Sequence, residues 1–65
     1  MKVSYFKETD TLYIEFKADE VAESKDLDEN TILDVDESGR VLAITIEHAS
    51  ARTDVHRLTL SGIAA

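Results

Sequence analysis

The sequence predicts an α+β fold that is mainly β: a small antiparallel β-meander of four to five strands with one short C-terminal helix. Three observations predict it. Apolar and polar residues alternate with period two in four segments of the first 47 residues, which is the pattern of half-buried strands. Short polar links of hairpin length separate some of these segments. A chain of 65 residues has room for one domain, spanning residues 1–65, because domains rarely fall below about 50 residues.

The first two segments form the first predicted hairpin. Val3 and Tyr5 alternate with polar residues, and Leu12, Ile14 and Phe16 do the same after a link of four polar residues. Strands that alternate in this way place their apolar side chains in one layer.

The segment from Ala18 to Asn30 has a different character. It carries six acidic residues, and its only large apolar side chains are Val21 and Leu27. It is either a solvated loop or a charged edge strand, which would protect the sheet from pairing with other chains. The functional alternative is an acidic strip that docks a partner.

Residues 31–36 and 40–47 form the second predicted hairpin. Gly39 lies in the link between them and can adopt the left-handed conformation that a short hairpin with a G1 bulge requires. Residues 40–47 are apolar on both faces through most of their length. This is typical of a central strand, or of one whose second face is covered by a helix or a partner subunit. The predicted apolar layer consists of Val3, Tyr5, Leu12, Ile14, Phe16, Leu33, Val35, Leu42, Ile44 and Ile46.

The tail from His48 to Ala65 allows two interpretations. Ser50 can cap a helix that runs to Arg57 and covers the apolar layer with Val55 and Leu58, which we favour. The alternation in residues 58–60 favours an extended segment instead. Gly62 would end either form.

Composition and charge exclude several classes of function. The net charge of −7 repels nucleic-acid phosphates and anionic membrane surfaces, whereas a basic protein partner fits it. No apolar run approaches the roughly 20 residues of a membrane span, and the N-terminus lacks the apolar core of a signal peptide. The chain has no cysteine, so it forms neither a disulfide nor a thiolate metal site. We expect a cytoplasmic protein without a cofactor.

Two groups of residues have the chemistry of a site. Asp34, Asp36, Ser38 and Gly39 match the start of an EF-hand calcium loop, but Thr45 stands where the bidentate glutamate belongs. We therefore predict a hairpin turn there.

A second group, at the end of the chain, consists of His48, Ser50, Asp54 and His56. It could serve a small hydrolase or a metal site, but no oxyanion hole or third metal ligand is identifiable. We predict that the protein is not an enzyme and holds no metal.

Chain length favours assembly with a second copy. A chain of this size buries only about 60% of its unfolded surface, and disulfides are not open to it as a staple. We expect a homodimer and a non-catalytic protein-interaction module. The residues that we expect at the interface are Val41, Ala43, Val55, Leu58, Leu60 and Ile63.

The pattern resembles the family called domain of unknown function 2283 over about residues 1–50. The residues that carry the resemblance are Val3-x-Tyr5, Asp10-x-Leu12-Tyr13-Ile14-x-Phe16, Val21-Ala22-Glu23-Ser24, Asp34-x-Asp36-x-x-Gly39-Arg40-Val41 and Ile44-x-Ile46-Glu47-x-Ala49-Ser50. The family consists of short bacterial and archaeal proteins of unestablished role, so the resemblance transfers no catalytic residue. Some members are encoded beside small toxin-like proteins. The resemblance therefore also implies an antitoxin-like role, in which the acidic chain neutralises a basic toxin.

Overall fold

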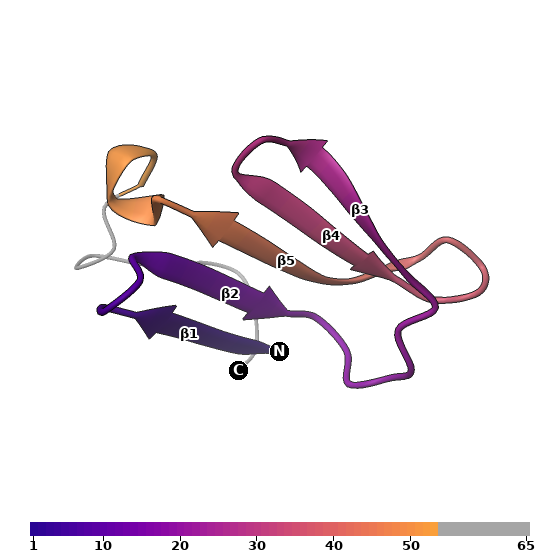
Figure 1. The fold of residues 1–65 in the computed structure, drawn as a ribbon. Helices are drawn as coiled ribbons and strands as arrows, with labels where there is room; N and C mark the ends of the chain where they lie inside the picture. The colour runs from indigo at the N-terminus through magenta and orange to yellow at the C-terminus, as the bar shows by residue number, and fades with distance from the viewer. Residues whose placement is uncertain (54–65) are drawn as a thin grey trace.

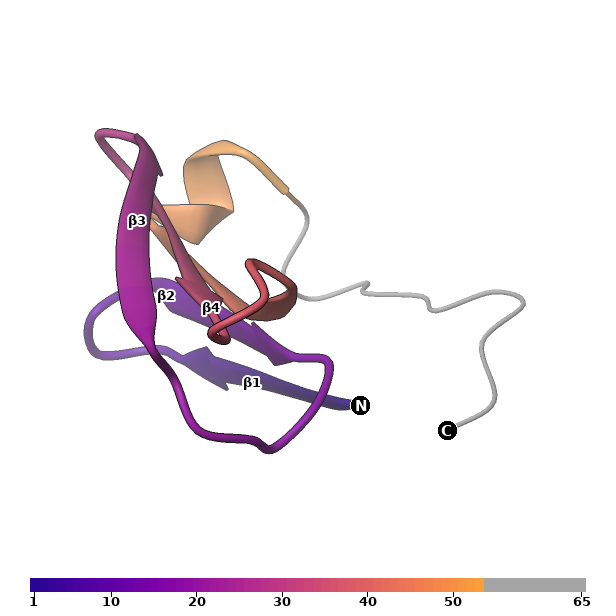
Figure 2. The same cartoon turned by 90° about the vertical axis from the view of Figure 1, so that its right-hand side faces the viewer.

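The computed structural model describes residues 1–53, which form one five-stranded antiparallel sheet (Figure 1). The strands are β1 (Lys2–Phe6), β2 (Thr11–Glu15), β3 (Glu23–Asp28), β4 (Thr31–Val35) and β5 (Val41–Glu47). They lie in the order β1-β2-β5-β4-β3. The sheet twists strongly, so that in Figure 2 the strand β3 runs vertically while β1 runs nearly horizontally. The predicted fold class, mainly β and antiparallel, is confirmed.

The strand order departs from the predicted meander at one connection. β2 and β3 follow each other in sequence but are separated in the sheet by β5 and β4. The connecting segment, residues 16–22, runs past the ends of β5 and β4 in Figure 1. Backbone N–H groups of Phe16 and Lys17 donate to the carbonyl of Leu42 at 2.7 and 3.3 Å, and that of Ala22 donates to Val35 at 2.8 Å. β5, the most apolar strand, thereby occupies the centre of the sheet, where apolar residues are best covered.

Gly39 adopts the conformation that the sequence predicts, with φ of +84° in the link between β4 and β5. Its N–H donates to the carbonyl of Asp36 at 3.0 Å, and the N–H of Asp36 donates to the carbonyl of Arg40 at 3.0 Å. A bulge follows at Leu42, because Val35 pairs with Val41 while Asp34 pairs with Ala43. The predicted second hairpin is therefore confirmed.

The acidic segment contributes an edge strand. Among residues 1–53, β3 pairs only with β4, and all six of its residues are exposed. Of the two alternatives for this segment, the charged edge strand holds for residues 23–28. A register shift between Asp26 and Asp28 makes the edge irregular. An irregular, charged edge pairs poorly with the strands of other chains.

The helix predicted from Ser50 is, within the described residues, a single 3-10 turn, η1 (Ala49–Ala51). His48, not Ser50, occupies its N-cap position, in the left-handed conformation. Ser50 lies inside the turn and not before it, and its hydroxyl donates to the carboxylate of Asp10 in the link between β1 and β2. The remainder of the predicted helix, from Asp54 onward, lies outside the described residues. No helical segment in residues 1–53 is long and apolar enough to cross a membrane.

Candidate functional site

One face of the sheet is apolar across four strands, and we call it the apolar face. Its central row joins Val3 of β1, Ile14 of β2, Ile44 of β5 and Leu33 of β4, which are paired in register. A second row consists of Tyr5, Leu12, Ile46 and Thr31. All members of the central row are half-buried. The period-two pattern predicts the apolar members of both rows, but it is wrong for Phe16, which follows the end of β2 and is 45% exposed.

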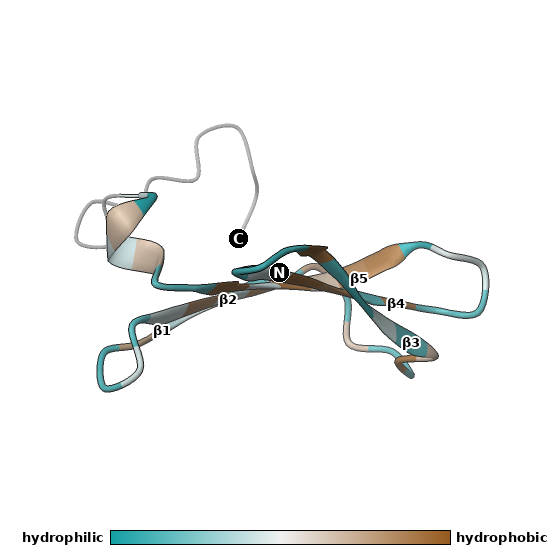
Figure 3. Cartoon of the chain, turned by 45° about the horizontal axis from the view of Figure 1, so that its top comes forward, coloured by the Kyte–Doolittle hydropathy of each residue, from teal (hydrophilic) through white to brown (hydrophobic). Residues whose placement is uncertain are grey.

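Figure 3 shows the sheet nearly edge-on, with η1 standing on one side of it. Within residues 1–53 the turn is the only regular element outside the sheet. Ala49 in the turn is fully buried, and Leu12 in the second row is 2% exposed. The turn is linked to the second row by Arg52, whose Nη1 donates to the hydroxyl of Thr31 at 2.6 Å. The central row lies beyond that link and keeps its partial exposure.

Asp10 fixes the turn to the first hairpin. Its carboxylate accepts hydrogen bonds from the Tyr5 hydroxyl at 2.6 Å and from the Ser50 hydroxyl at 2.7 Å, and its Oδ1 also accepts the Ser50 N–H at 3.1 Å. The carbonyl of Asp10 accepts the N–H of Ala49 at 2.9 Å. Asp10 has a φ of +53°, which aspartate tolerates better than most residues. The hydrogen bond from Tyr5 is the main cause that lowers the pKa of Asp10, and the bond from Ser50 is the second. The hydrogen bond between Tyr5 and Asp10 also raises the pKa of Tyr5.

The β3 side of the apolar face carries charges that are paired within the chain. Register places Lys25 and Glu23 beside Leu33 and Val35, and Lys25 Nζ lies 3.6 Å from Glu23 Oε1. Arg52 Nη1 lies 3.6 Å from Asp28 Oδ2. The Asn30 N–H donates to Asp28, and this bond is the main cause that lowers the pKa of Asp28. The face thus has an apolar centre and a polar margin, the usual anatomy of a protein interface.

The opposite face of the sheet is polar. The Tyr13 hydroxyl donates to Glu15 Oε2 at 3.4 Å, and burial followed by the charge of Glu15 raises the pKa of Tyr13. Ser24 of β3 donates to Asp34 of β4 at 2.6 Å. Ala43 lies in the row of Glu15 and Asp34 and is 2% exposed. Two hydrogen-bonded pairs of side chains thus lie on this face.

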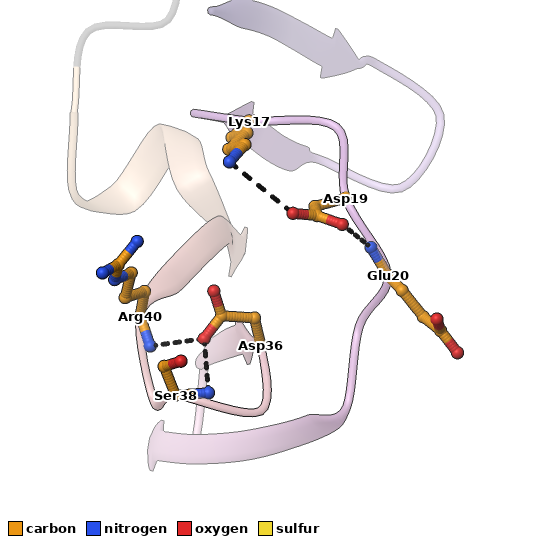
Figure 4. A network of polar contacts seen from close by, with 6 residues as sticks. All are labelled: Lys17, Asp19, Glu20, Asp36, Ser38 and Arg40. Atoms are coloured by element: carbon orange, nitrogen blue, oxygen red, sulfur yellow. Dashed lines mark hydrogen bonds and ion pairs between the residues drawn. The ribbon is translucent and has the colours of Figure 1, made fainter.

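A recess of about 330 Å³ lies between residues 16–22 and the turn from β4 to β5, and its lining consists of Asp19, Glu20, Ala22, Asp36, Glu37 and Ser38. Figure 4 shows how two of its carboxylates are bonded. Asp36 Oδ1 accepts the N–H groups of Ser38 and Arg40 at 2.8 and 3.0 Å. Asp19 accepts the N–H of Glu20 at 2.8 Å and lies 3.6 Å from Lys17 Nζ. These carboxylates hold the local backbone in shape.

The residues that match the start of a calcium loop lie in and beside the turn between β4 and β5. Asp36 is directed at its own turn, whereas Asp34 accepts a hydrogen bond from β3, so the two carboxylates serve different partners. Among residues 1–53, no group of three or more histidine, aspartate or glutamate side chains could hold a metal ion.

The structure describes part of each group of predicted site residues. Val41 is 40% exposed at the bulge, whereas Ala43 is covered within the chain and has almost no surface to offer a partner. Val55, Leu58, Leu60 and Ile63 lie outside the described residues. Of the histidine and serine group, Ser50 donates directly to a carboxylate and not to an imidazole, and His48 is exposed beside the turn. Asp54 and His56 lie outside the described residues.

Sequence reasoning did not identify the cluster of Tyr5, Asp10 and Ser50. The sequence pattern places Tyr5 in the core, Ser50 at a helix cap and Asp10 in a polar link. The usable signal was Asp10 itself, since an aspartate at the end of a hairpin link tolerates the left-handed conformation and offers two acceptor oxygens. Its two side-chain partners are 5 and 40 residues away in sequence, which no local pattern reveals.

Comparison with known proteins identifies a family. No curated protein and no solved structure matches the chain significantly. The family model described as a protein of unknown function, DUF2283, matches residues 2–50 of the 65-residue chain. That segment contains all five strands and most of η1, so the match covers the sheet, the apolar face and the Asp10 cluster. The chain belongs to the DUF2283 family of proteins of unknown function.

Proposed function

We propose that this protein is a non-catalytic protein-interaction module that acts as a homodimer in the cytoplasm. The observation that supports the proposal is the apolar face, whose central row is half-buried on a sheet that makes a single layer in residues 1–53. Stable domains bury the apolar side of a sheet against a second layer. A partner chain can supply that layer, and two-fold pairing is the commonest arrangement of soluble oligomers.

The polar groups near the apolar face support a role without catalysis. The hydroxyls of Tyr5 and Ser50 and the carboxylate of Asp10 are all used in bonds that hold η1 against the first hairpin. Arg52 is likewise bonded to Thr31. The polar side chains that converge at this end of the sheet thus serve to fix the backbone. The cysteine-free composition suits a reducing compartment, which is the basis for placing the protein in the cytoplasm.

Sedimentation equilibrium over a range of micromolar concentrations tests the homodimer. We expect a mass of twice 7.2 kDa that falls toward the monomer value only on dilution. A mass of 7.2 kDa at every concentration, with cooperative unfolding retained, would contradict the proposal.

A second candidate is an antitoxin-like partner of a basic protein. It is favoured by the position of the acidic residues, since β3 is a fully exposed edge that carries Glu23, Asp26 and Asp28, and the preceding connection adds Asp19 and Glu20. Complementary charge of this kind speeds association with a basic surface and makes it sensitive to salt.

Affinity capture from the native host tests this second candidate. The tagged protein is compared with a variant that combines Glu20→Gln and Asp26→Asn, since no ion pair within residues 1–53 involves either residue. A basic partner would be retained by the wild type at low salt and lost with the variant or at high salt. Equal retention by both proteins at both salt concentrations would argue against the acidic strand as the contact.

A further inference from the structure

We propose that two copies of this chain pack with their apolar faces against each other, so that the central row of Val3, Ile14, Ile44 and Leu33 lies at the middle of the contact. The inference rests on the proposed homodimer and names its surface. The pair of sheets would form a sandwich of ten strands, with the two layers about 10 Å apart as in other face-packed sheets.

The dimensions of the molecule suit such a contact. The described part of the chain is a slab with extents of 33 × 30 × 17 Å, and the apolar face lies on one of its broad sides. A standard interface takes roughly 800 Å² from each partner, which a side of 33 × 30 Å can provide. The face extends without a break over four neighbouring strands, whereas the narrow edges of the slab are one strand wide.

The distribution of charge favours the apolar face as the side on which a second copy binds, because a like-charged copy is repelled least there. Each chain carries a net charge of −7, so contacts between acidic surfaces would repel. Of the acidic residues in strands, register places only Glu23 and Asp28 on the side of the apolar face, and both are paired with cations of the same chain. The others lie on the opposite face, and they are Glu15, Asp26, Asp34 and Glu47.

The turn η1 determines where on the face the contact is centred. It stands on one side of the sheet in Figure 3. That side is the apolar one, because the turn is tied to Thr31 through Arg52 and to Tyr5 through Asp10. The second row is therefore covered at its end, and Leu12 within it is already buried. Within residues 1–53, no regular element stands over the central row, so a second copy meets its half-buried apolar side chains there.

The sheet edges are weaker candidates for self-pairing. β3 carries three acidic residues and a register shift, so that two copies of this edge would bring like charges together. β1 is a short edge of five residues. Pairing through either edge would add strands to the sheet, but it would not bury the side chains of the apolar face.

Two matched pairs of substitutions test the surface by sedimentation equilibrium. Ile44→Lys changes the central row, and Thr45→Lys changes the next residue of β5, which is equally half-buried but lies on the opposite face. Val3→Lys and Ser4→Lys repeat the comparison on the edge strand β1, where a substitution disturbs the fold less. Each lysine reduces the negative charge of the chain, so dissociation cannot be ascribed to general repulsion. Circular dichroism establishes that each variant is folded.

We expect Ile44→Lys and Val3→Lys to raise the dissociation constant of the dimer by at least about 100-fold, since each dimer would bury two unpaired ammonium groups. Thr45→Lys and Ser4→Lys should change it by less than about 3-fold, within the range of surface substitutions. If Ile44→Lys does not fold, Val3→Lys decides the question. A wild-type dimer that withstands both central-row variants overturns the proposed surface and leaves the homodimer intact. A wild-type chain that is monomeric throughout overturns both proposals.

Discussion

Gly39 provides the sharpest test of the hairpin between β4 and β5. Its φ of +84° lies where an L-residue costs roughly 1–2 kcal/mol. A Cβ placed on Gly39 would meet no atom within 4 Å, so steric crowding adds nothing and the backbone alone sets the cost. We expect Gly39→Ala to lower the free energy of unfolding by about 1 kcal/mol. Gly39→Val should cost more because its branched Cβ tolerates this region poorly, and Gly39→Asn should cost less.

Urea denaturation followed by circular dichroism measures these differences, at one fixed protein concentration because a dimer's stability depends on it. A loss of about 1 kcal/mol corresponds to a fall of about 4–8 °C in the unfolding temperature of a domain this small. Ser38→Ala is the matched control, since the neighbouring residue is exposed and does not have a positive φ. If Gly39→Ala is as stable as the control, the turn does not depend on the left-handed conformation and the reasoning fails.

The other predictions concern Asp10, the core and metal ions. Because Asp10 has a pKa below its ordinary value of 3.8, its contribution to stability is complete above that pH and is lost as the pH falls through the lowered pKa. The stability difference between wild type and Asp10→Asn should therefore shrink in acid titrations; a constant difference would refute this. Leu12→Ala should cost about 2–5 kcal/mol in denaturant unfolding, whereas Leu27→Ala, at a position that is 65% exposed, should cost within about 0.5 kcal/mol; equal losses would contradict the assigned core. Calcium or zinc should leave the unfolding temperature unchanged, because Asp36 is engaged by two backbone N–H groups; micromolar binding in calorimetry would disprove it.

Four of the five strands were predictable from the sequence because their pattern is local, whereas the sequence of β3 was equally compatible with a loop. Each of these strands has apolar residues at alternate positions, and strand register aligns one apolar residue from each into a single row: Val3, Ile14, Leu33 and Ile44. The order of the strands was not predictable, because the same alternation is compatible with β3 lying beside β2. In the structure, β5 pairs with β2 at one edge and with β4 at the other, and its pairing with β2 joins residues far apart in sequence.

The candidate site divides in the same way. The apolar face follows from hydrophobic periodicity, so its members could be named in advance. The Asp10 cluster could not, because Ser50 meets Asp10 only after β2 and β5 have paired. The sequence of Ser50 and the residues after it has genuine helical spacing. In the structure, Ser50 lies inside η1 and its hydroxyl donates to Asp10, which is 40 residues away in sequence.

The central position of β5 has a consequence for how the chain reaches this structure. β5 is the last of the five strands to be synthesised, yet it is the only one that joins the β1–β2 hairpin to the β3–β4 hairpin. An isolated two-stranded hairpin is marginally stable in water, so neither half can persist before residues 41–47 are available. Pairing of Leu12 with Ile46 also closes a long loop, which slows the formation of a sheet. Folding should therefore begin after synthesis of β5 and proceed in one cooperative step, and substitutions in β5 should slow it more than substitutions in β1 or β3.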